Sequence, residues 1–139
     1  MDEAAMIGPT CSIQIEATAK RSIISRTLEE KKMFEHIVLL KLKPDVSIDQ
    51  QEDAVKRVHA FKGNIPGIVD LSAGINVTEE TEHMQGFTLG IRVTFENQQA
   101  CRDYIQHPLH QHFLQSIGPF AEGIVVMDYP NESVHQKGN

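Results

Sequence analysis

Apolar residues recur at β-strand spacing in four stretches of the chain, at 34–42, 68–77, 87–95 and 124–129. The first stretch is rich in Ile, Val and Leu, which is typical of a strand. The next two alternate, with the apolar face formed by Val69, Leu71, Ala73, Ile75 and Val77, then by Phe87, Leu89, Ile91, Val93 and Phe95. Because residues with a period of two share one face of a strand, each alternating stretch predicts a half-buried strand.

Helical spacing fills the gaps between these strands. Ser47, with Gln50 three residues later, forms a capping-box pattern that starts the first predicted helix, and the Gly- and Pro-rich stretch 63–67 ends it. Asn97 caps a second helix, and Pro108 suits the first turn of the helical piece that follows. The apolar positions at helical spacing are Val55, Val58, Phe61 and Ile65, then Ala100, Cys101, Tyr104 and Ile105, then Leu109, Phe113, Leu114 and Ile117.

The resulting order is β-α-β-β-α-β, with the second helix broken at Pro108. It predicts an α+β fold of the ferredoxin-like kind, an antiparallel four-stranded sheet with its helices on one face. The first strand is apolar on both faces, because Ile37 and Leu39 point away from Val38 and Leu40. Since the helices cover one face, a second copy of the sheet is the simplest cover for the other, and we expect a homodimer. The two alternating strands are polar on that second face.

Charge divides the chain of 139 residues into an extension and one domain. Residues 1–32 are neutral, and their acidic residues and missing apolar core argue against a secretory or transit signal, whereas 33–130 contain the whole net charge of −6. Two interpretations of residues 1–32 stay open: a natural extension, partly helical or disordered, or a mis-annotated start upstream of Met33. We expect 33–130 to be the folded domain and 131–139 to be a flexible polar tail.

Composition excludes several classes of protein. No apolar run reaches the roughly 18 residues of a membrane span, so we expect no membrane insertion. The acidic balance and the absence of Trp argue against nucleic-acid binding. The chain has two cysteines, which make no disulfide framework, and a cytoplasmic location is therefore the expectation.

The chemistry concentrates in the segment Tyr104-Ile-Gln-His107-Pro108-Leu-His110. Tyr104 and His110 both lie on the apolar sides of their helical pieces, and His36 lies on the more apolar face of the first strand. Burial keeps a histidine neutral and basic, which suits proton abstraction, and a tyrosine hydroxyl can hold a carbonyl or enolate oxygen. The alternative is that these groups are satisfied core residues.

Other polar residues near this segment have simpler explanations. His107, beside Pro108, reads as a cap or hinge residue, and strand parity leaves Asp128 facing either the pocket or solvent. His107, His110 and His112 are close in sequence, but no carboxylate or cysteine lies at a matching ligand spacing. We therefore expect neither a metal site nor a cofactor.

These residues carry a resemblance. Met33-Phe-Glu-His36-Ile-Val-Leu-Leu-Lys, Tyr104-x-x-His107-Pro108-x-His110 and Val126-Met-Asp128-Tyr129 resemble the stress-responsive A/B barrel (Dabb) domain family over about residues 33–130. The resemblance implies a dimeric α+β barrel. By similarity to a plant polyketide cyclase of that family, Tyr104 and His110 are implied to be the catalytic pair. His36 and Asp128 are implied to line the ligand pocket, with Leu89 where that cyclase has a further pocket histidine. We count His107 as a further candidate for the pocket.

Three functions follow as hypotheses. The favoured one is a cytoplasmic, stress-associated Dabb protein whose pocket binds a small apolar or aromatic molecule. The second is a cofactor-free enzyme that uses the His/Tyr pair, for polyketide-cyclase-like aldol chemistry or a monooxygenase-like oxidation. The third is a structural oligomer without a ligand. An apolar cavity beside His36, Tyr104 and His110 favours the first two, and a filled core favours the third.

Overall fold

A single antiparallel sheet forms the scaffold of the computed structural model, which describes residues 32–132. Its strands are β1 (Phe34–Leu42), β2 (Ile68–Ile75), β3 (Leu89–Phe95) and β4 (Ala121–Pro130), in the spatial order β2-β3-β1-β4. All three pairings are antiparallel, and β2 and β4 are the edges. The predicted α+β, ferredoxin-like arrangement is confirmed. The predictions for residues 1–31 and 133–139 lie outside the described residues.

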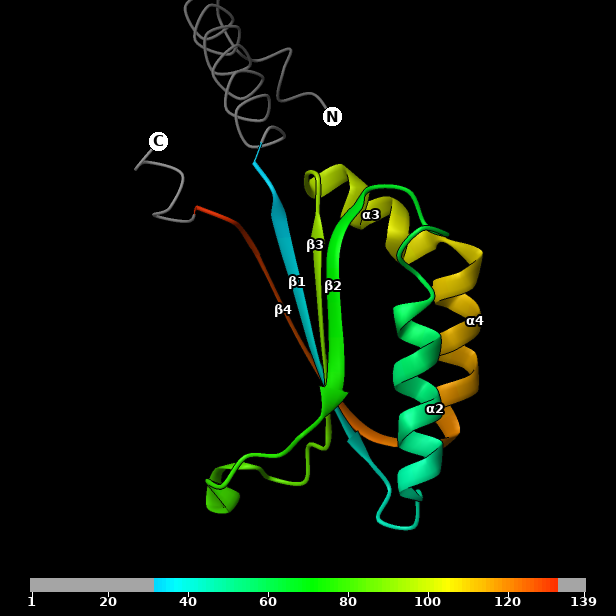
Figure 1. Cartoon of the computed structure of the whole chain (residues 1–139), viewed down its shortest axis with the longest axis vertical. Helices are drawn as coiled ribbons and strands as arrows, with labels where there is room; N and C mark the ends of the chain where they lie inside the picture. Colours follow the sequence, from blue (N-terminus) through cyan, green and yellow to red (C-terminus); the bar gives the residue numbers. More distant parts are fainter. Residues whose placement is uncertain (1–31, 133–139) are drawn as a thin grey trace, which may run out of the picture.

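Three α-helices lie on one side of this sheet (Figure 1). They are α2 (Ile48–His59), α3 (Gln98–Gln106) and α4 (Pro108–Ile117), and short 3₁₀ turns lie at η1 (Thr81–His83) and η2 (Gly118–Phe120). The capping box at Ser47 is confirmed, because its side chain accepts from the Gln50 amide and the Gln50 side chain accepts from the Ser47 amide. None of the helices in the described part is long and apolar enough to cross a membrane.

The end of α2 differs from the prediction. The helix stops at His59, so Phe61 and Ile65 are not part of it, although both are buried. The Phe61 amide donates to Val58 at 2.9 Å, which tightens the last turn, and Gly63 then takes a left-handed φ of 91°. Phe61 and Ile65 therefore enter the core from a loop, and their spacing in the sequence only resembles that of a helix.

The apolar face of β2 also departs from the alternation. The register with β3 shifts between Ile68 and Asp70, so a bulge places Ile68 and Leu71 on the core side. Val69 is therefore 40% exposed, and Val77, beyond the end of the strand, is 88% exposed. The prediction that both residues face the core is wrong, because strict alternation does not survive a bulge or a strand end.

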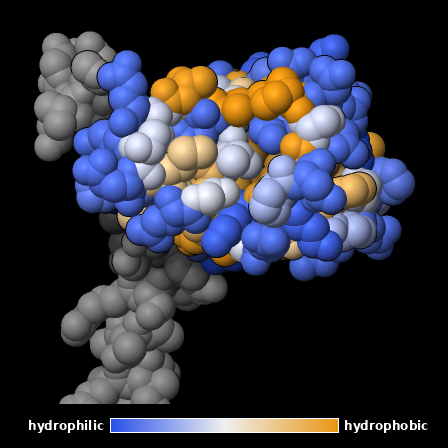
Figure 2. All heavy atoms as spheres, turned by 90° about the horizontal axis from the view of Figure 1, so that it is seen from below, coloured by the Kyte–Doolittle hydropathy of each residue, from blue (hydrophilic) through white to orange (hydrophobic). Residues whose placement is uncertain are grey.

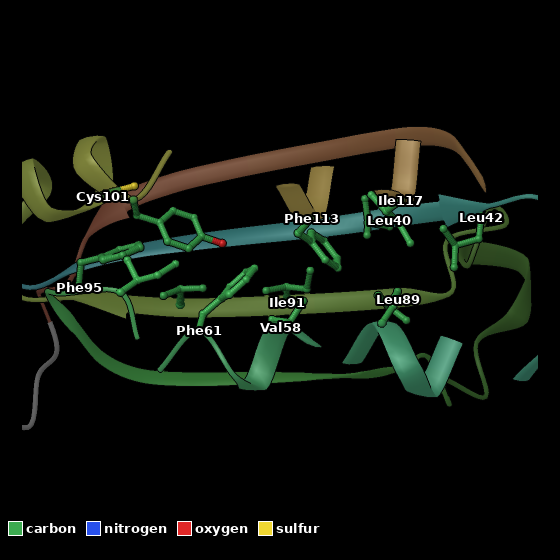
Figure 3. Close-up of a cluster of buried hydrophobic side chains, with 14 of the residues drawn as sticks. Leu40, Leu42, Val58, Phe61, Leu89, Ile91, Phe95, Cys101, Phe113 and Ile117 are labelled. Atoms are coloured by element: carbon green, nitrogen blue, oxygen red, sulfur yellow. The ribbon is translucent and has the colours of Figure 1, made fainter. Parts of the chain in front are cut away.

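The core lies between the sheet and the helices (Figure 3). Its fully buried side chains are Leu40, Val58, Leu89, Val93 and Phe95. Burying a side chain of this size stabilises the fold by about 1.5–3 kcal/mol. The strands β1 and β3 thus hold the molecule together, while β4 forms its less covered edge.

The other side of the sheet is open and divided into two halves. Toward β1 and β4 it presents apolar side chains, among them Leu39, Val125 and Met127, which are all exposed. Toward β2 and β3 it is polar, as predicted for the two alternating strands. Figure 2 views the molecule end-on, from below the orientation of Figure 1, and there apolar residues gather in patches beside broad hydrophilic areas.

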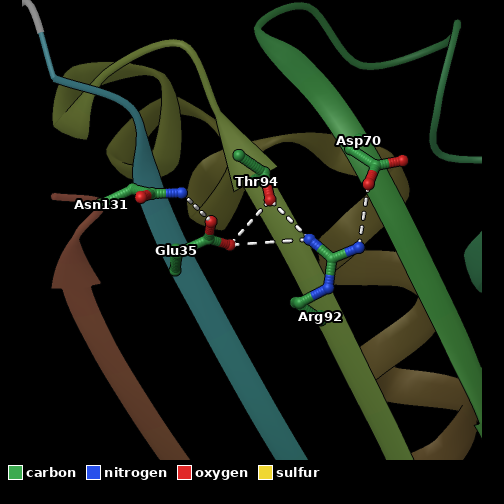
Figure 4. A network of polar contacts seen from close by, with 5 residues as sticks. All are labelled: Glu35, Asp70, Arg92, Thr94 and Asn131. Carbon is green, nitrogen blue, oxygen red and sulfur yellow. Dashed lines mark hydrogen bonds and ion pairs between the residues drawn. The ribbon is translucent and has the colours of Figure 1, made fainter. Parts of the chain in front are cut away.

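A polar network occupies one end of this open face (Figure 4). The two carboxylate oxygens of Glu35 accept from Thr94 and Asn131, each at 2.7 Å. Arg92 donates to Thr94 at 2.7 Å and to Asp70 at 2.9 Å. The hydrogen bond from Arg92 lowers the pKa of Asp70, and the same bond raises the pKa of Arg92. The network ties β1, β2 and β3 to the residue that follows β4.

Candidate functional site

The break between α3 and α4 places the two residues of interest. His107 caps α4 with an extended backbone, and its Nδ1 accepts from the Leu109 amide at 3.1 Å. Pro108 follows at the first helical position, where its missing N–H costs nothing. The interpretation of His107 as a cap is therefore confirmed. Tyr104, in the last turn of α3, and His110, in the first turn of α4, meet across this corner.

Tyr104 and His110 are both buried, and their ring centroids are 4.4 Å apart. Phe61 packs edge-on against both, at 5.9 Å from Tyr104 and 6.4 Å from His110. Phe95 contacts Tyr104 at 5.0 Å. Aromatic walls therefore fix the two rings, as catalytic or ligand-binding groups require.

One hydrogen bond determines the protonation of His110. Its Nδ1 lies 3.1 Å from the Ile105 carbonyl oxygen, and because a carbonyl only accepts, Nδ1 must carry the proton. Burial lowers the pKa of His110 below its ordinary value of 6.5, so the ring is neutral near pH 7. Its Nε2 then presents a lone pair. Burial also raises the pKa of Tyr104, which therefore keeps its proton and can donate it in a hydrogen bond.

Two polar atoms of this pair, the Tyr104 hydroxyl oxygen and His110 Nε2, have no hydrogen-bond partner in the part of the chain that the structure describes. The side-chain atoms there that are both fully buried and without a partner are two others, Gln51 Oε1 and Thr88 Oγ1. Since neither the Tyr104 hydroxyl oxygen nor His110 Nε2 is fully buried, each has some exposure to solvent. A hydrogen-bond donor and a base therefore lie side by side, each with slight exposure.

His36 and Asp128 form a second polar pair next to the first. They are direct partners in the register of β1 and β4, and His36 Nδ1 lies 2.6 Å from Asp128 Oδ1. The His36 ring meets Tyr104 edge-on at 5.6 Å. Strand parity alone left the direction of Asp128 open, and the structure turns it to the helix side, toward His36.

Two of the implied pocket residues lie elsewhere. Leu89 pairs with Leu40, whereas His36 pairs with Val93, so Leu89 lies four residues further along β3, about 13 Å away along the strand. His107 lines a separate surface cavity of about 360 Å³ beside the start of α3. The structure thus brings together His36, Tyr104, His110 and Asp128, but neither Leu89 nor the His107 ring.

The main cavities of the described part lie away from Tyr104 and His110. A cavity of about 860 Å³ lies on the open face under the loop between β2 and β3, and one of about 290 Å³ lies between α2 and the end of α4. On β4, the helix-side residues Ile124 and Val126 are 52% and 53% exposed. His36, Tyr104 and His110 line none of the three cavities described above, and aromatic side chains pack around the pair, which is the arrangement expected to favour a structural role.

Cys101 is the residue that sequence reasoning missed. It is buried on α3, one turn before Tyr104, and ligand atoms of His36, Cys101 and Asp128 all lie within 4.8 Å of one another. In the described part of the chain, His107, His110 and His112 form no comparable group. Burial raises the pKa of the Cys101 thiol to about 12. A local search for ligand spacing could not find this group, because its members come from three distant elements.

Comparison with known proteins identifies relatives of this chain. Olivetolic acid cyclase from Cannabis sativa is 32% identical over 94 residues, which cover 68% of this chain and 92% of the cyclase. The solved structure of At3g17210 from Arabidopsis thaliana matches with a TM-score of 0.65 and 29% identity, over 73% of this chain and 97% of that one. A dimeric ferredoxin-like protein from Thermobifida fusca has the same TM-score at 19% identity, over 73% of this chain and 93% of that one, which shows the shared fold. The stress responsive A/B barrel domain family, Dabb, matches residues 34–131, and the chain belongs to that family.

Proposed function

We propose that this protein binds a small apolar or aromatic carbonyl compound beside Tyr104 and His110, and that His110 removes a proton from the carbon next to the carbonyl. One observation carries the proposal. The bond from His110 Nδ1–H to the Ile105 carbonyl leaves Nε2 as a neutral base next to an unpartnered tyrosine hydroxyl. A purely structural histidine would gain nothing from leaving both groups unsatisfied.

The chemistry needs only these two groups. As His110 Nε2 takes the proton, the electron pair of the C–H bond moves onto the carbonyl oxygen, which receives a hydrogen bond from Tyr104. The enolate carbon then attacks a second carbonyl carbon of the same molecule, so one C–C bond forms and one C=O π bond breaks. The proton on His110 passes to the new alkoxide, which restores the neutral ring. His36 acts by positioning, through its contact with the Tyr104 ring.

The likeness to olivetolic acid cyclase supports this class of reaction but not the same substrate. Leu89 stands where that cyclase is expected to have a further pocket histidine, and here Leu89 is sealed in the core. Leu89 also lies about 13 Å along the strand from the level of His36, so it does not contact a ligand beside Tyr104. We therefore propose a substrate that makes no polar contact at that position.

We also propose a homodimer in which the second copy covers the open face. The exposed apolar half of that face, at Leu39, Val125 and Met127, is costly to leave in water, and the related protein from Thermobifida fusca is described as dimeric. A cytoplasmic, stress-associated role without nucleic-acid partners fits the acidic chain and its family. Sedimentation at micromolar concentration tests the dimer, and a monomer there contradicts it.

Ligand-dependent thermal stability tests the binding step. Small aromatic and polyketide-like carbonyl compounds are screened against the wild type, Tyr104→Phe and His110→Gln, with the exposed His59→Gln as a matched control. At a hundredfold excess over Kd, a ligand adds about 2.7 kcal/mol to the free energy of unfolding. We expect one compound to raise the Tm of the wild type and of His59→Gln but not of the other two. If no compound binds and both site variants melt lower, the pair is core packing and the structural interpretation is correct.

Deuterium exchange tests the chemical step separately. A compound that binds is incubated in D₂O with each variant, and exchange at the carbon next to its carbonyl is followed by NMR. We expect the wild type and His59→Gln to accelerate exchange and His110→Gln to lose the acceleration. Binding without accelerated exchange in the wild type would leave a ligand-binding protein and contradict the proposed proton transfer.

A further inference from the structure

Three side chains from distant parts of the chain converge beside Tyr104. His36 comes from β1, Cys101 from α3 and Asp128 from β4, and their ligand atoms lie within 4.8 Å of one another. Figure 3 shows the Cys101 sulfur on α3 at one end of the core. His36 and Cys101 are buried, while the Asp128 side chain is partly open to solvent. We propose that these three residues form a binding site for one divalent cation of the zinc type.

The donor set selects the class of cation. Imidazole nitrogen, thiolate sulfur and carboxylate oxygen together suit Zn²⁺ and similar transition metals, whereas Mg²⁺ and Ca²⁺ require oxygen ligands. Ligand atoms around a tetrahedral zinc lie about 3.3–3.8 Å apart, given metal–ligand distances of about 2.0–2.3 Å. His36 Nδ1 and Asp128 Oδ1 lie 2.6 Å apart and must separate, and the Cys101 sulfur lies within 4.8 Å of the other two ligand atoms. Movements of about 1 Å complete the three-ligand site.

Charge balance favours the bound state in this buried place. Two positive charges on the cation meet one negative charge from the Cys101 thiolate and one from Asp128, and neutral His36 adds none. The thiol proton leaves to solvent, and the ring proton of His36 moves to Nε2, so Nδ1 can bind the metal. The complex is neutral overall, which keeps the cost of burying its charges small. Three protein ligands also leave a fourth position open, as in zinc sites that bind water or a substrate.

The site shares His36 with the proposed function, in which that ring positions Tyr104, but neither Tyr104 nor His110 is a ligand, so metal binding can be tested without the reaction. The competing explanation is a hydrogen-bonded His36–Asp128 pair with an inert thiol beside it. That explanation accounts for the 2.6 Å contact but predicts no affinity of the thiol for metal. The two explanations therefore differ in one measurable property, which is a sulfur–metal bond.

Cobalt(II) is the probe that reports this bond. The full-length chain, reduced and stripped by a chelator, is titrated with Co²⁺ and followed by absorption for the thiolate-to-cobalt charge-transfer band in the near ultraviolet. We expect the band to saturate at one equivalent and to vanish when Zn²⁺ is added. Cys101→Ser loses the band, and Cys11→Ser, the matched control at the other cysteine of the chain, keeps it.

Two further variants keep the test decisive if Cys101→Ser fails to fold. Asp128→Asn and His36→Gln each retain shape but lose a ligand, and we expect each to weaken Zn²⁺ binding by more than the roughly 10- to 100-fold that is typical of outer-shell changes. His83→Gln, an exposed histidine in η1, serves as the control for metal binding at the surface. A folded wild type without the band, or a band that follows Cys11 instead of Cys101, would overturn the site.

Discussion

Glu35 and His36 are neighbours on β1, but they face opposite sides of the sheet and belong to polar groups of opposite character. On the open face, each carboxylate oxygen of Glu35 has a hydrogen-bond donor, and Arg92 has two acceptors (Figure 4). On the helix side, His36 is paired with Asp128, but the adjoining Tyr104 hydroxyl and His110 Nε2 have no partner among the described residues. Polar groups that stabilise a fold have all their hydrogen-bond partners within the protein. Groups that act on a ligand are held in place but keep one hydrogen-bonding atom without a protein partner. This contrast indicates a structural role for the satisfied group and supports the proposed ligand-binding role of the other.

The largest effect is expected from removing the proposed base, His110. His110→Gln keeps a polar side chain of similar size but offers no basic nitrogen. We expect deuterium exchange in the bound carbonyl compound to fall by about 10²–10⁴-fold, the usual range for a general base. The fold should persist, and circular dichroism is the control. Exchange that survives in a folded His110→Gln would assign the base to another residue.

The same residue predicts a pH dependence. Burial lowers the pKa of His110 in the folded protein, so between that lowered value and 6.5 the unfolded chain binds a proton that the folded chain does not. Stability at this site is therefore present above pH 6.5 and is lost as the pH falls through that window. Urea unfolding of the wild type and His110→Gln at several pH values measures it. Identical pH profiles for the two proteins would show that His110 is not held neutral by the fold.

Removing the Tyr104 hydroxyl should separate function from stability. Because that hydroxyl makes no hydrogen bond to a described residue, Tyr104→Phe should change the free energy of unfolding by less than about 1 kcal/mol. The rate of exchange should fall by about 10²–10³-fold, as when one donor to a developing oxyanion is lost. Parallel urea titrations and exchange assays give the two numbers. A large loss of stability without loss of exchange would reverse the assignment.

Most of the fold could be predicted from the sequence because the signals that determine its elements are local. The capping box at Ser47, the break at Pro108 and the alternation in β3 each act within a few residues, and each predicts its element, although β3 begins at Leu89 rather than at Phe87. The failures have non-local causes: the bulge that exposes Val69 is a property of the pairing with β3, and the end of α2 depends on a turn. The direction of the Asp128 side chain and the neighbours of Cys101 likewise depend on how β1, β4 and α3 pack together.

Thr94 offers the matched experiment on the open face. Its hydroxyl donates to Glu35 and accepts from Arg92, so Thr94→Val removes two bonds from a buried network while conserving volume. We expect a loss of about 1–3 kcal/mol in the free energy of unfolding and no change in exchange. Tyr104→Phe deletes a hydroxyl as well, so the pair of variants compares a satisfied group with an unsatisfied one. Equal stability of the two variants would remove the distinction between the faces.

The smallest effect is expected at the rim of that network. Asp70 accepts from Arg92 in full exposure to solvent, where water and salt compete with the bond, so Asp70→Asn should alter stability less than Thr94→Val does. Because Arg92 lowers the pKa of Asp70 in the folded protein, this contribution is present above the ordinary value of 3.8 and disappears as the pH falls through the lowered value. Urea unfolding at neutral and at acidic pH, with and without added salt, resolves it. If Asp70→Asn cost as much as Thr94→Val, burial would not be what makes the network structural, and the contrast between the two faces would have to rest on charge instead.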